Sequence, residues 1–334
     1  MKALSLLGEG RVEITEIAEP TLNKGDLLLK VEMVGLCGSD LNSFRGRNPL
    51  ITYPRVLGHE IAATVLEGNA TVVAGTHVTV SPYTGCGKCP SCRRGRENAC
   101  RYNETFGVQR DGAITERLAV PAGKVYPSTL PLKTLCLVEP LTVGFHAAAR
   151  GRVTKDDVVA VFGCGGVGLG AIAGAAFRGA RTIAIDLDDA KLATAAKAGA
   201  TDLIHSKRED VRDRLRDITG GDGPDVMIEA IGLPETFRMA VEEVAFTGRV
   251  VYIGYAKEPV AYETRLFVQK ELDILGSRNA LPENFREVIQ MLEARRFPVD
   301  EAISHMVGMS DAPEVLKAWS AEPARFSKIM IEVG

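Results

Sequence analysis

Four cysteines within a 15-residue stretch form the densest set of metal-binding side chains in the chain. Their spacing is Cys86-x2-Cys89-x2-Cys92-x7-Cys100. Four thiolates satisfy tetrahedral Zn²⁺ and leave no open position, which is typical of a structural zinc site. The bacterial ferredoxin pattern of an iron–sulfur cluster has three residues before its last cysteine and a proline after it. Here the last gap is seven residues and Arg101 follows, so the spacing favours zinc.

A nucleic-acid-binding zinc ribbon is the alternative interpretation of this loop. Its support is a group of nearby arginines, Arg93, Arg94, Arg96 and Arg101. Ribbons, however, usually use two separated C-x2-C pairs. The formal net charge of the chain is −3, which gives no electrostatic reason to expect nucleic acid or an anionic membrane as a partner.

A second set of metal-binding side chains is spread along the sequence. Cys37 lies in Gly-Leu-Cys-Gly-Ser-Asp, and His59 and Glu60 lie in Gly-His-Glu. Glu139 is an acidic residue at the start of an otherwise apolar predicted helix. Taken alone, a buried structural cysteine, a capping histidine and an acid favoured by the helix dipole would account for these residues.

The segment Gly163-Cys164-Gly165-Gly166-Val167-Gly168 fits the pattern G-x-G-x-x-G. It follows a predicted strand and begins a predicted helix, the context in which this pattern binds a dinucleotide pyrophosphate at the helix N-terminus. Asp186 comes 23 residues after Gly163, directly after the next strand. A carboxylate there accepts hydrogen bonds from both ribose hydroxyls and repels a 2′-phosphate, so the sequence favours NAD over NADP. Lys191 could counter this preference by binding a 2′-phosphate, although a lysine on an amphipathic helix is more often only solvated. For the glycine motif, the alternative interpretation is a close-packed strand–helix turn in another kind of α/β protein.

The elements that must position these residues change in character along the chain. The first ~130 residues are predicted to be β-rich and irregular. Beyond them strands and helices alternate, which indicates a parallel sheet. The predicted strands are 158–162, 181–185, 226–230, 249–253, 272–275 and 328–333, and the predicted helices are 140–150, 168–177, 189–198, 234–245 and 283–296.

The length of 334 residues and a hydrophobic content of 46% fit two globular domains. We expect an α/β protein with a β-rich domain over 1–146, to which 281–334 return, and a doubly wound nucleotide-binding domain over 147–280. Residues 158–177 carry no charge, but their glycines favour a strand, turn and helix over a membrane span. Without a recognisable secretory signal at the N-terminus, we expect a soluble cytoplasmic protein.

Taken together and in this order, the motifs resemble the zinc-dependent medium-chain dehydrogenases, the superfamily of alcohol, sorbitol and threonine dehydrogenases. The matching marks are Cys37-Gly38-Ser39-Asp40, Gly58-His59-Glu60, the four-cysteine loop, Glu139-Pro140-Leu141 and the glycine turn. The resemblance implies a GroES-like catalytic domain, a Rossmann domain, and two zinc ions per subunit, one catalytic and one structural. Alcohol dehydrogenase itself is a standard example of a catalytic zinc held by two cysteines and a histidine.

The resemblance also assigns roles to single residues. It implies Cys37 and His59 as ligands of the catalytic zinc and Glu60 as a ligand or close neighbour. Glu139 stands where alcohol dehydrogenases have a cysteine ligand, which points to the sorbitol and threonine branch; Cys136 nearby is predicted to be a core cysteine. The resemblance further implies that Asp40 orients the zinc-bound histidine and that Ser39 takes the substrate proton. Asn42 stands where many members of the superfamily have a histidine that relays this proton. Ile253 and Ser277 are implied to bind the cofactor.

Such enzymes transfer a hydride from an alcohol to a nicotinamide cofactor, with zinc acting as a Lewis acid on the substrate hydroxyl. Two segments, 53–60 and 276–280, are similar to polyol and sugar-acid dehydrogenases of the L-galactonate 5-dehydrogenase type. Arg278 or Asn279 in the second segment would face cofactor or a polar substrate, or simply form a strand-end turn. We therefore expect an NAD-dependent polyol or aldonate dehydrogenase forming a homodimer or homotetramer. A threonine-type dehydrogenase, a zinc-free quinone reductase and a non-enzymatic zinc- and nucleotide-binding protein are the alternatives.

Overall fold

The computed structural model describes residues 1–334 and divides them into two compact units. Unit 1 comprises Met1–Glu139, Leu281–Ile289 and Val299–Gly334, and unit 2 comprises Pro140–Ala280 and Gln290–Pro298. None of the helices combines the length and the apolar character that a membrane crossing requires.

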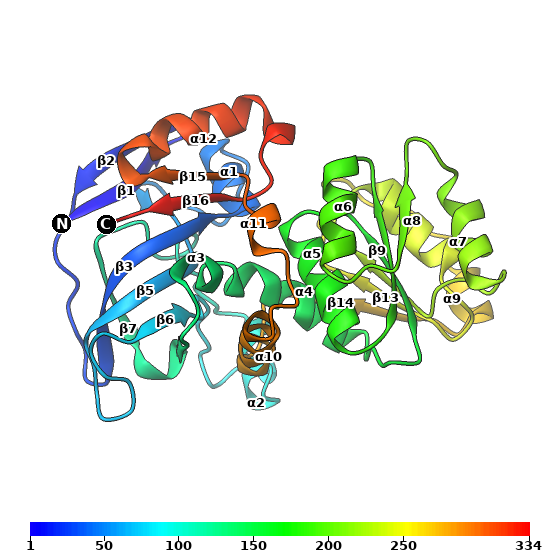
Figure 1. The fold of residues 1–334 in the computed structure, drawn as a ribbon, viewed down its shortest axis with the longest axis horizontal. Helices are drawn as coiled ribbons and strands as arrows, with labels where there is room; N and C mark the ends of the chain where they lie inside the picture. The colour runs from blue at the N-terminus through cyan, green and yellow to red at the C-terminus, as the bar shows by residue number, and fades with distance from the viewer. The chain divides into compact units, whose positions relative to one another are not determined.

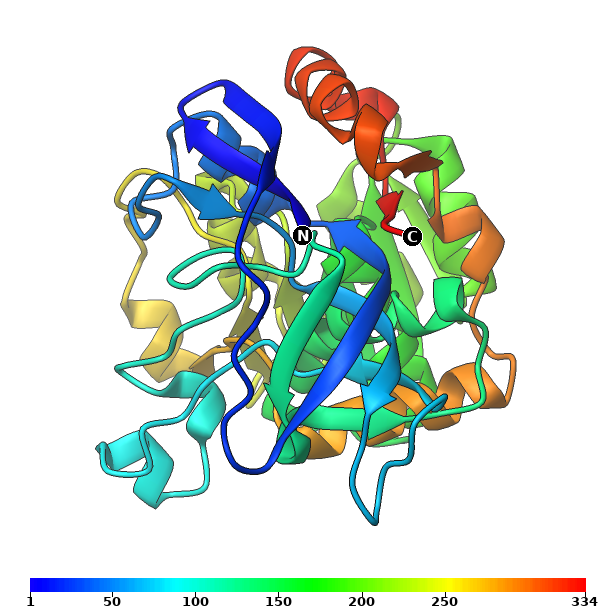
Figure 2. The same ribbon diagram turned by 90° about the vertical axis from the view of Figure 1, so that its left-hand side faces the viewer.

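Unit 1 is built on two largely antiparallel sheets (Figures 1 and 2). A three-stranded sheet has the order β2-β1-β4, and a seven-stranded sheet has the order β15-β16-β3-β5-β6-β8, with β7 paired to β3. The strands are β1 Lys2–Gly8, β2 Arg11–Glu16, β3 Asp26–Leu36, β4 Arg55–Val56, β5 Glu60–Glu67, β6 His77–Val80, β7 Arg117–Pro121, β8 Val125–Pro127, β15 His305–Gly308 and β16 Ile329–Glu332.

The long strand β3 organises unit 1, because it pairs with β5, β7 and β16. Its burial alternates at first and becomes continuous near Leu36, as expected for a strand that ends inside the core. Gly35 lies directly opposite Glu60 of β5 in this register. The helices that complete the unit are α1 Gly38–Phe44, α2 Pro90–Arg93, η1 Glu97–Ala99, η2 Ala122–Lys124, α3 Leu132–Leu135, α11 Val299–Ala302, η3 Met309–Asp311, α12 Ala312–Ala321 and η4 Pro323–Arg325.

Unit 2 contains a six-stranded parallel sheet with the order β11-β10-β9-β12-β13-β14. Numbered within the unit this is 3-2-1-4-5-6, the order of the doubly wound dinucleotide-binding fold. The strands are β9 Val158–Phe162, β10 Arg181–Asp186, β11 Asp202–His205, β12 Val226–Glu229, β13 Arg249–Tyr252 and β14 Asp273–Gly276. The helices are α5 Gly166–Phe177, α6 Asp189–Lys197, α7 Val211–Thr219, α8 Pro234–Glu243 and α9 Arg265–Gln269, preceded by α4 Val138–Arg150 and followed by α10 Pro282–Glu293.

The predicted fold class is confirmed, and the predicted elements need local corrections. Helix α5 begins at Gly166, two residues before the predicted start, because the turn tightens into a helix directly after Gly165. Helix α4 begins at Val138 rather than at Pro140, which places Glu139 in its first turn. The sequence analysis did not predict β11, α7 or α12. Figure 1 shows the helices of unit 2 around its sheet, where α5 contacts β9 and β10 and α8 contacts β12.

Candidate functional site

The four cysteines of the 86–100 loop converge in the structure. Their sulfur atoms lie within 4.8 Å of one another. Cys89 Sγ is 3.5 Å from Cys92 Sγ and 3.8 Å from Cys100 Sγ. A tetrahedron with Zn–S bonds of about 2.3 Å has S···S edges of about 3.8 Å. The donor set therefore fits a four-thiolate zinc ion in both chemistry and spacing.

Backbone amides already favour the thiolate form in this loop. The Cys89 amide donates to Cys86 Sγ at 3.3 Å, and the Cys86 and Tyr102 amides donate to Cys100 Sγ at 3.4 and 3.3 Å. Hydrogen bonds from Ser91 and from backbone amides lower the pKa of Cys89 to about 5. Burial raises the pKa of Cys92 to about 11, so a cation is needed to hold all four cysteines as thiolates at neutral pH.

Cys37, His59 and Glu60 form the second cluster, although 22 or more residues separate the cysteine from the other two. Cys37 precedes α1 as its N-cap, His59 directly precedes β5, and Glu60 is the first residue of that strand. Their ligand atoms all lie within 4.8 Å of one another. A thiol, an imidazole and a carboxylate at this spacing are a suitable donor set for zinc.

Asp40 holds this cluster together. Its carboxylate accepts a hydrogen bond from the Cys37 amide at 2.8 Å and from the Gly58 amide at 3.3 Å, and it lies 4.0 Å from His59 Nδ1. Burial disfavours a charged imidazole, but the negative charge of Asp40 and the Cys37 thiol outweigh burial and raise the pKa of His59 well above its usual range. His59 Nδ1 and Ser39 Oγ are buried without a hydrogen-bond partner. Buried polar atoms are normally satisfied. Nδ1 faces the Asp40 carboxylate at 4.0 Å, so the Ser39 hydroxyl is the atom that indicates an additional group at the site.

Glu60 is fully buried and paired with a lysine that the sequence analysis missed. Lys328 Nζ donates to both carboxylate oxygens, at 2.6 and 2.7 Å, and to the Leu36 carbonyl at 3.2 Å. Gly35 leaves the space for this carboxylate, since a Cβ there would lie 2.0 Å from Glu60 Oε2. No local signal identifies Lys328, because 268 residues separate it from Glu60.

Glu139 lies outside the 4.8 Å cluster but is electrostatically coupled to it. Its carboxylate accepts a hydrogen bond from the hydroxyl of Tyr83, also missed by the sequence analysis. Burial raises the pKa of Glu139 to about 7, opposed by the charge of His59. Cys136 is fully buried and donates to the Glu60 carbonyl at 3.3 Å, which agrees with its prediction as a core cysteine.

The glycine turn joins β9 to α5 as predicted. Gly163 has φ +93°, which favours glycine, and a Cβ on Gly168 would lie 1.8 Å from the Gly163 carbonyl oxygen. A Cβ on Gly165 would meet no atom within 4 Å, so the space before the helix N-terminus is open. The first-turn amides of a helix lack intrahelical partners, and a pyrophosphate fits this cradle. Gly166 and Val167 form the first turn of α5 itself.

Asp186 ends strand β10 and is fixed by backbone amides. It accepts from Cys164 at 2.8 Å, from Leu187 at 2.7 Å and from Asp188 at 3.1 Å. These bonds hold the carboxylate beside the glycine turn with accepting capacity to spare, since a carboxylate offers about four lone-pair sites. Lys191 lies on α6, where its amide caps onto Asp188 at 3.0 Å.

Two further predicted cofactor residues lie at the carboxyl ends of strands in unit 2. Ile253 follows β13, and its amide donates to the Glu229 carbonyl at 2.9 Å. Ser277 follows β14 and is buried, and its hydroxyl has no partner. The sequence analysis missed Glu229, which accepts from Ile231, Gly232 and Thr236 and fixes the loop after β12.

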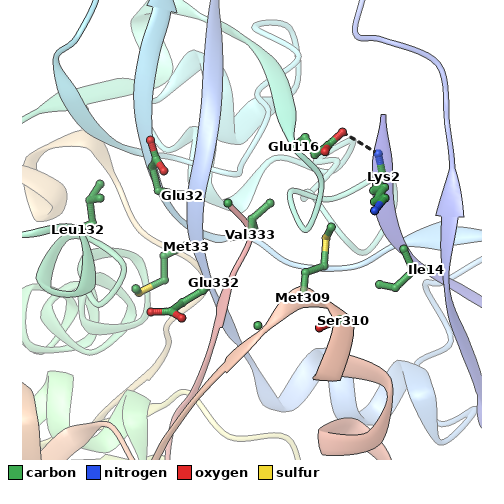
Figure 3. A pocket seen from close by; sticks show the side chains of 12 residues that line it. Lys2, Ile14, Glu32, Met33, Glu116, Leu132, Met309, Ser310, Glu332 and Val333 are labelled. Atoms are coloured by element: carbon green, nitrogen blue, oxygen red, sulfur yellow. Dashed lines mark hydrogen bonds between the residues drawn. The ribbon is translucent and has the colours of Figure 1, made fainter.

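One pocket of unit 1 contains none of the predicted site residues. It has a volume of about 840 Å³ and is lined by Glu32, Glu116, Glu332, Lys2 and Gly334, among others (Figure 3). The Glu116 carboxylate accepts from the Lys2 amide at 2.9 Å, the dashed contact in Figure 3. The two groups of candidate metal ligands therefore do not line this pocket.

The chain belongs to the zinc-dependent alcohol dehydrogenase family. Residues 23–131 match the model of the alcohol dehydrogenase GroES-like domain, and residues 166–294 match that of the zinc-binding dehydrogenase.

Among its relatives is an uncharacterized zinc-type alcohol dehydrogenase-like protein of Haemophilus influenzae. It is 33% identical, and the alignment covers 98% of both chains. The L-galactonate-5-dehydrogenase of Escherichia coli is 32% identical over 86% of this chain and 85% of its own. The L-threonine 3-dehydrogenase of Bacillus licheniformis is 31% identical over 93% of both.

Solved structures of similar fold hold either nicotinamide cofactor. An alcohol dehydrogenase from Escherichia coli CFT073 complexed with NADH has a TM-score of 0.90 at 26% identity and covers 99% of both chains. A dehydrogenase from Sinorhizobium meliloti 1021, described as zinc-binding and bound to NADP, has a TM-score of 0.91 at 29% identity, covering 99% of this chain and 98% of its own. The chain is thus an oxidoreductase of the family that acts on alcohols.

Proposed function

We propose that the protein is an NAD- and zinc-dependent dehydrogenase that oxidises a secondary alcohol of a polyol or sugar acid. The observation that carries this proposal is the convergence of Cys37, His59 and Glu60, together with the buried, unpartnered hydroxyl of Ser39. Cys37 and His59 hold the catalytic zinc, and a carboxylate oxygen of Glu60 or Glu139 completes the set. A second zinc ion is held by the four cysteines of the 86–100 loop.

When bound, the catalytic zinc supplies Lewis acidity toward the substrate hydroxyl. The chain's own residues supply the rest. The amides of Cys37 and Gly58 fix the Asp40 carboxylate by hydrogen bonds, and the fixed carboxylate orients His59. The unpartnered hydroxyl of Ser39 is the group that accepts the substrate proton. Asn42 is exposed and its side chain does not titrate, so it cannot relay this proton, which is released to water instead.

NAD is the proposed coenzyme because Asp186 is held where the adenosine ribose is expected. A carboxylate in this position accepts from ribose hydroxyls and repels a 2′-phosphate. Gly163, Gly165 and Gly168 make room for the pyrophosphate, and Ile253 and Ser277 are proposed to contact the rest of the coenzyme.

A homodimer or homotetramer in the cytoplasm is the proposed state of the enzyme. Strand β14 is one of the two edge strands of the parallel sheet, and most of its residues are exposed. The edge strands of native proteins are normally protected against pairing with other chains. A second subunit along β14 would supply that protection.

The test is NAD⁺ reduction, followed by absorbance, with L-galactonate, polyols, simple alcohols and L-threonine, with and without a chelator. We expect chelator-sensitive oxidation of a sugar acid or polyol, faster with NAD⁺ than with NADP⁺, and two zinc ions per subunit. Preferred oxidation of L-threonine would select the threonine-type alternative. Absence of turnover in a zinc-loaded, NAD-binding protein would refute the substrate class.

Two cysteine variants form a matched pair for this test. Cys37→Ser should abolish turnover and remove one zinc ion per subunit while unfolding near the wild-type temperature. Cys136→Ser changes a buried cysteine of the same unit and should retain both zinc ions. Full turnover in Cys37→Ser would contradict the proposed zinc site.

A further inference from the structure

Arg110 is a half-buried guanidinium without an ionic partner. No carboxylate lies within 4.0 Å of it, and its one hydrogen bond is a long one, from Nη2 to the Pro82 carbonyl at 3.4 Å. Its Nε is buried with no partner at all. A guanidinium carries five N–H donors and stays charged in proteins. Burying such a group without an anion is costly, so its burial calls for an explanation.

The acidic residues near Arg110 in the sequence do not form an ion pair with it. Asp111 Oδ1 accepts from Arg55 Nη1 and from the Val56 amide, both at 3.1 Å. Glu104 acts on Arg110 only through its charge, and burial still lowers the pKa of the guanidinium. The chain itself therefore does not neutralise Arg110.

The guanidinium is held in a fixed orientation. Its Cζ lies 3.7 Å from the centroid of the Phe106 ring, and Phe106 is buried. Stacking occupies the face of a guanidinium but leaves its in-plane N–H donors available. Because Nε of Arg110 is buried, the donors left for an anion are those of its two Nη groups. This preorganised fork is suited to bidentate recognition of a carboxylate or phosphate.

The turn that carries Arg110 is pressed against the segment leading to His59. A Cβ on Gly107 would lie 2.7 Å from the Gly58 amide nitrogen, and a Cβ on Gly112 would lie 2.4 Å from the Leu57 carbonyl oxygen. The Ala113 amide also donates to the Gly58 carbonyl at 2.9 Å. Arg110 is two residues from Gly112, so at most ~7 Å of extended chain separates it from this contact.

Two contacts connect the free end of the side chain to one of the proposed metal ligands, Glu139. Its hydrogen-bond acceptor is the carbonyl of Pro82, and the next residue, Tyr83, donates to the carboxylate of Glu139. We propose that Arg110 binds a terminal anionic group of the substrate, a carboxylate or a phosphate, while a hydroxyl of the same molecule occupies the zinc site. This inference rests on the proposed function and adds to it a preference for anionic over neutral polyols.

The test compares kcat and KM of the zinc-loaded enzyme for L-galactonate, galactitol 1-phosphate and neutral galactitol. In Arg110→Met the KM for the preferred anionic substrate should rise ~10-fold or more with kcat nearly retained, because charged hydrogen bonds to a remote group are lost. The values for galactitol should stay within about threefold. Arg110→Lys should recover part of the loss, since lysine restores the charge but not the fork. Whether the carboxylate or the phosphate is preferred identifies the anion.

Arg325→Met is the matched control, because Arg325 also lies over an aromatic ring, Phe326, but is exposed. It should leave the preference for anionic substrates unchanged. Equal losses for charged and neutral substrates in Arg110→Met would overturn the inference.

If the wild type oxidises none of the three compounds, the proposed substrate class fails and binding decides the role of Arg110. In calorimetric titrations of the NAD-bound, zinc-loaded protein, L-galactonate binding that disappears in Arg110→Met supports the inference. Binding that survives the substitution, or no binding to the wild type, overturns it.

Discussion

Removing the amine of Lys328 should destabilise unit 1 strongly. Lys328 and Glu60 form a buried ion pair, with side chains 7% and 0% exposed, and the amine reaches both carboxylate oxygens at 2.6 and 2.7 Å. Lys328→Met keeps the length of the side chain and leaves the Glu60 carboxylate without its cation. Breaking a buried pair from one side costs about 3–5 kcal/mol in the free energy of unfolding. At about 2–4 °C per kcal/mol for a domain of this size, Tm should fall by ~6–20 °C.

A double-mutant cycle separates this pair from general damage. Glu60→Gln alone should cost less than Lys328→Met alone. Burial opposes the charged amine, and Glu60 is the main group that nevertheless raises the pKa of Lys328. Without that carboxylate the amine can deprotonate. The double variant, Lys328→Met with Glu60→Gln, should recover part of the stability lost in Lys328→Met.

The assay is thermal and denaturant unfolding of the four proteins, with zinc content measured in parallel. A Lys328→Met protein as stable as the wild type would refute the reasoning. So would a double variant whose loss equals the sum of the two single losses, since groups that interact directly are not additive.

Three further predictions concern other contacts. Gly35→Ala should cost about 1–3 kcal/mol and reduce zinc content, because the added methyl would lie 2.0 Å from Glu60 Oε2; unchanged zinc content and Tm would contradict the tight fit. Burial opposes ionisation of Asp157, but Arg249 and the backbone outweigh it and lower the pKa of the carboxyl, so its stabilisation is present above the unfolded pKa of about 3.9 and lost as pH falls further. Asp157→Asn should therefore lower Tm at pH 7 and converge with the wild type only as pH falls below the lowered pKa of the folded state, and a Tm difference independent of pH would contradict this. Cys89→Ala should remove one zinc ion and expose the 86–100 loop to proteolysis while the other zinc ion is retained; loss of both ions would show that the two sites are not independent.

The sequence predicts those parts of the fold and site that rest on local pattern. The six consecutive residues of the glycine turn carry their own context in the preceding strand and following helix. The four cysteines lie on one short loop, so their spacing alone fixes the donor set. Strand β9 is a continuous apolar run and β10 has an apolar centre at 183–185, and their predicted bounds agree with the structure to within one residue.

Contacts made across long separations are not visible in the sequence. Tyr83 reaches Glu139 over 56 residues, and Lys328 reaches Glu60 over 268. Neither residue type is unusual in its local setting. Only the register of β16 on β3, and of β3 on β5, brings the lysine to the carboxylate. Short or half-exposed elements such as β11 carry too weak a hydrophobic period to be predicted.

The position of β16 inside the sheet, between β15 and β3, has a consequence for the order in which the protein forms during translation. β16 pairs with β3, and Lys328 bonds to the Leu36 carbonyl across 292 residues of chain. Most of unit 2 leaves the ribosome before this strand is made, and domains generally fold as units as they emerge. The GroES-like sheet therefore stays incomplete until β15 and β16 have been synthesised. Until then, the Glu60 carboxylate lacks its cation, the amine of Lys328. Nascent chains halted before residue 328 should present a folded nucleotide-binding unit beside an unfinished zinc-binding one, so that competence for catalysis arrives with the last strand.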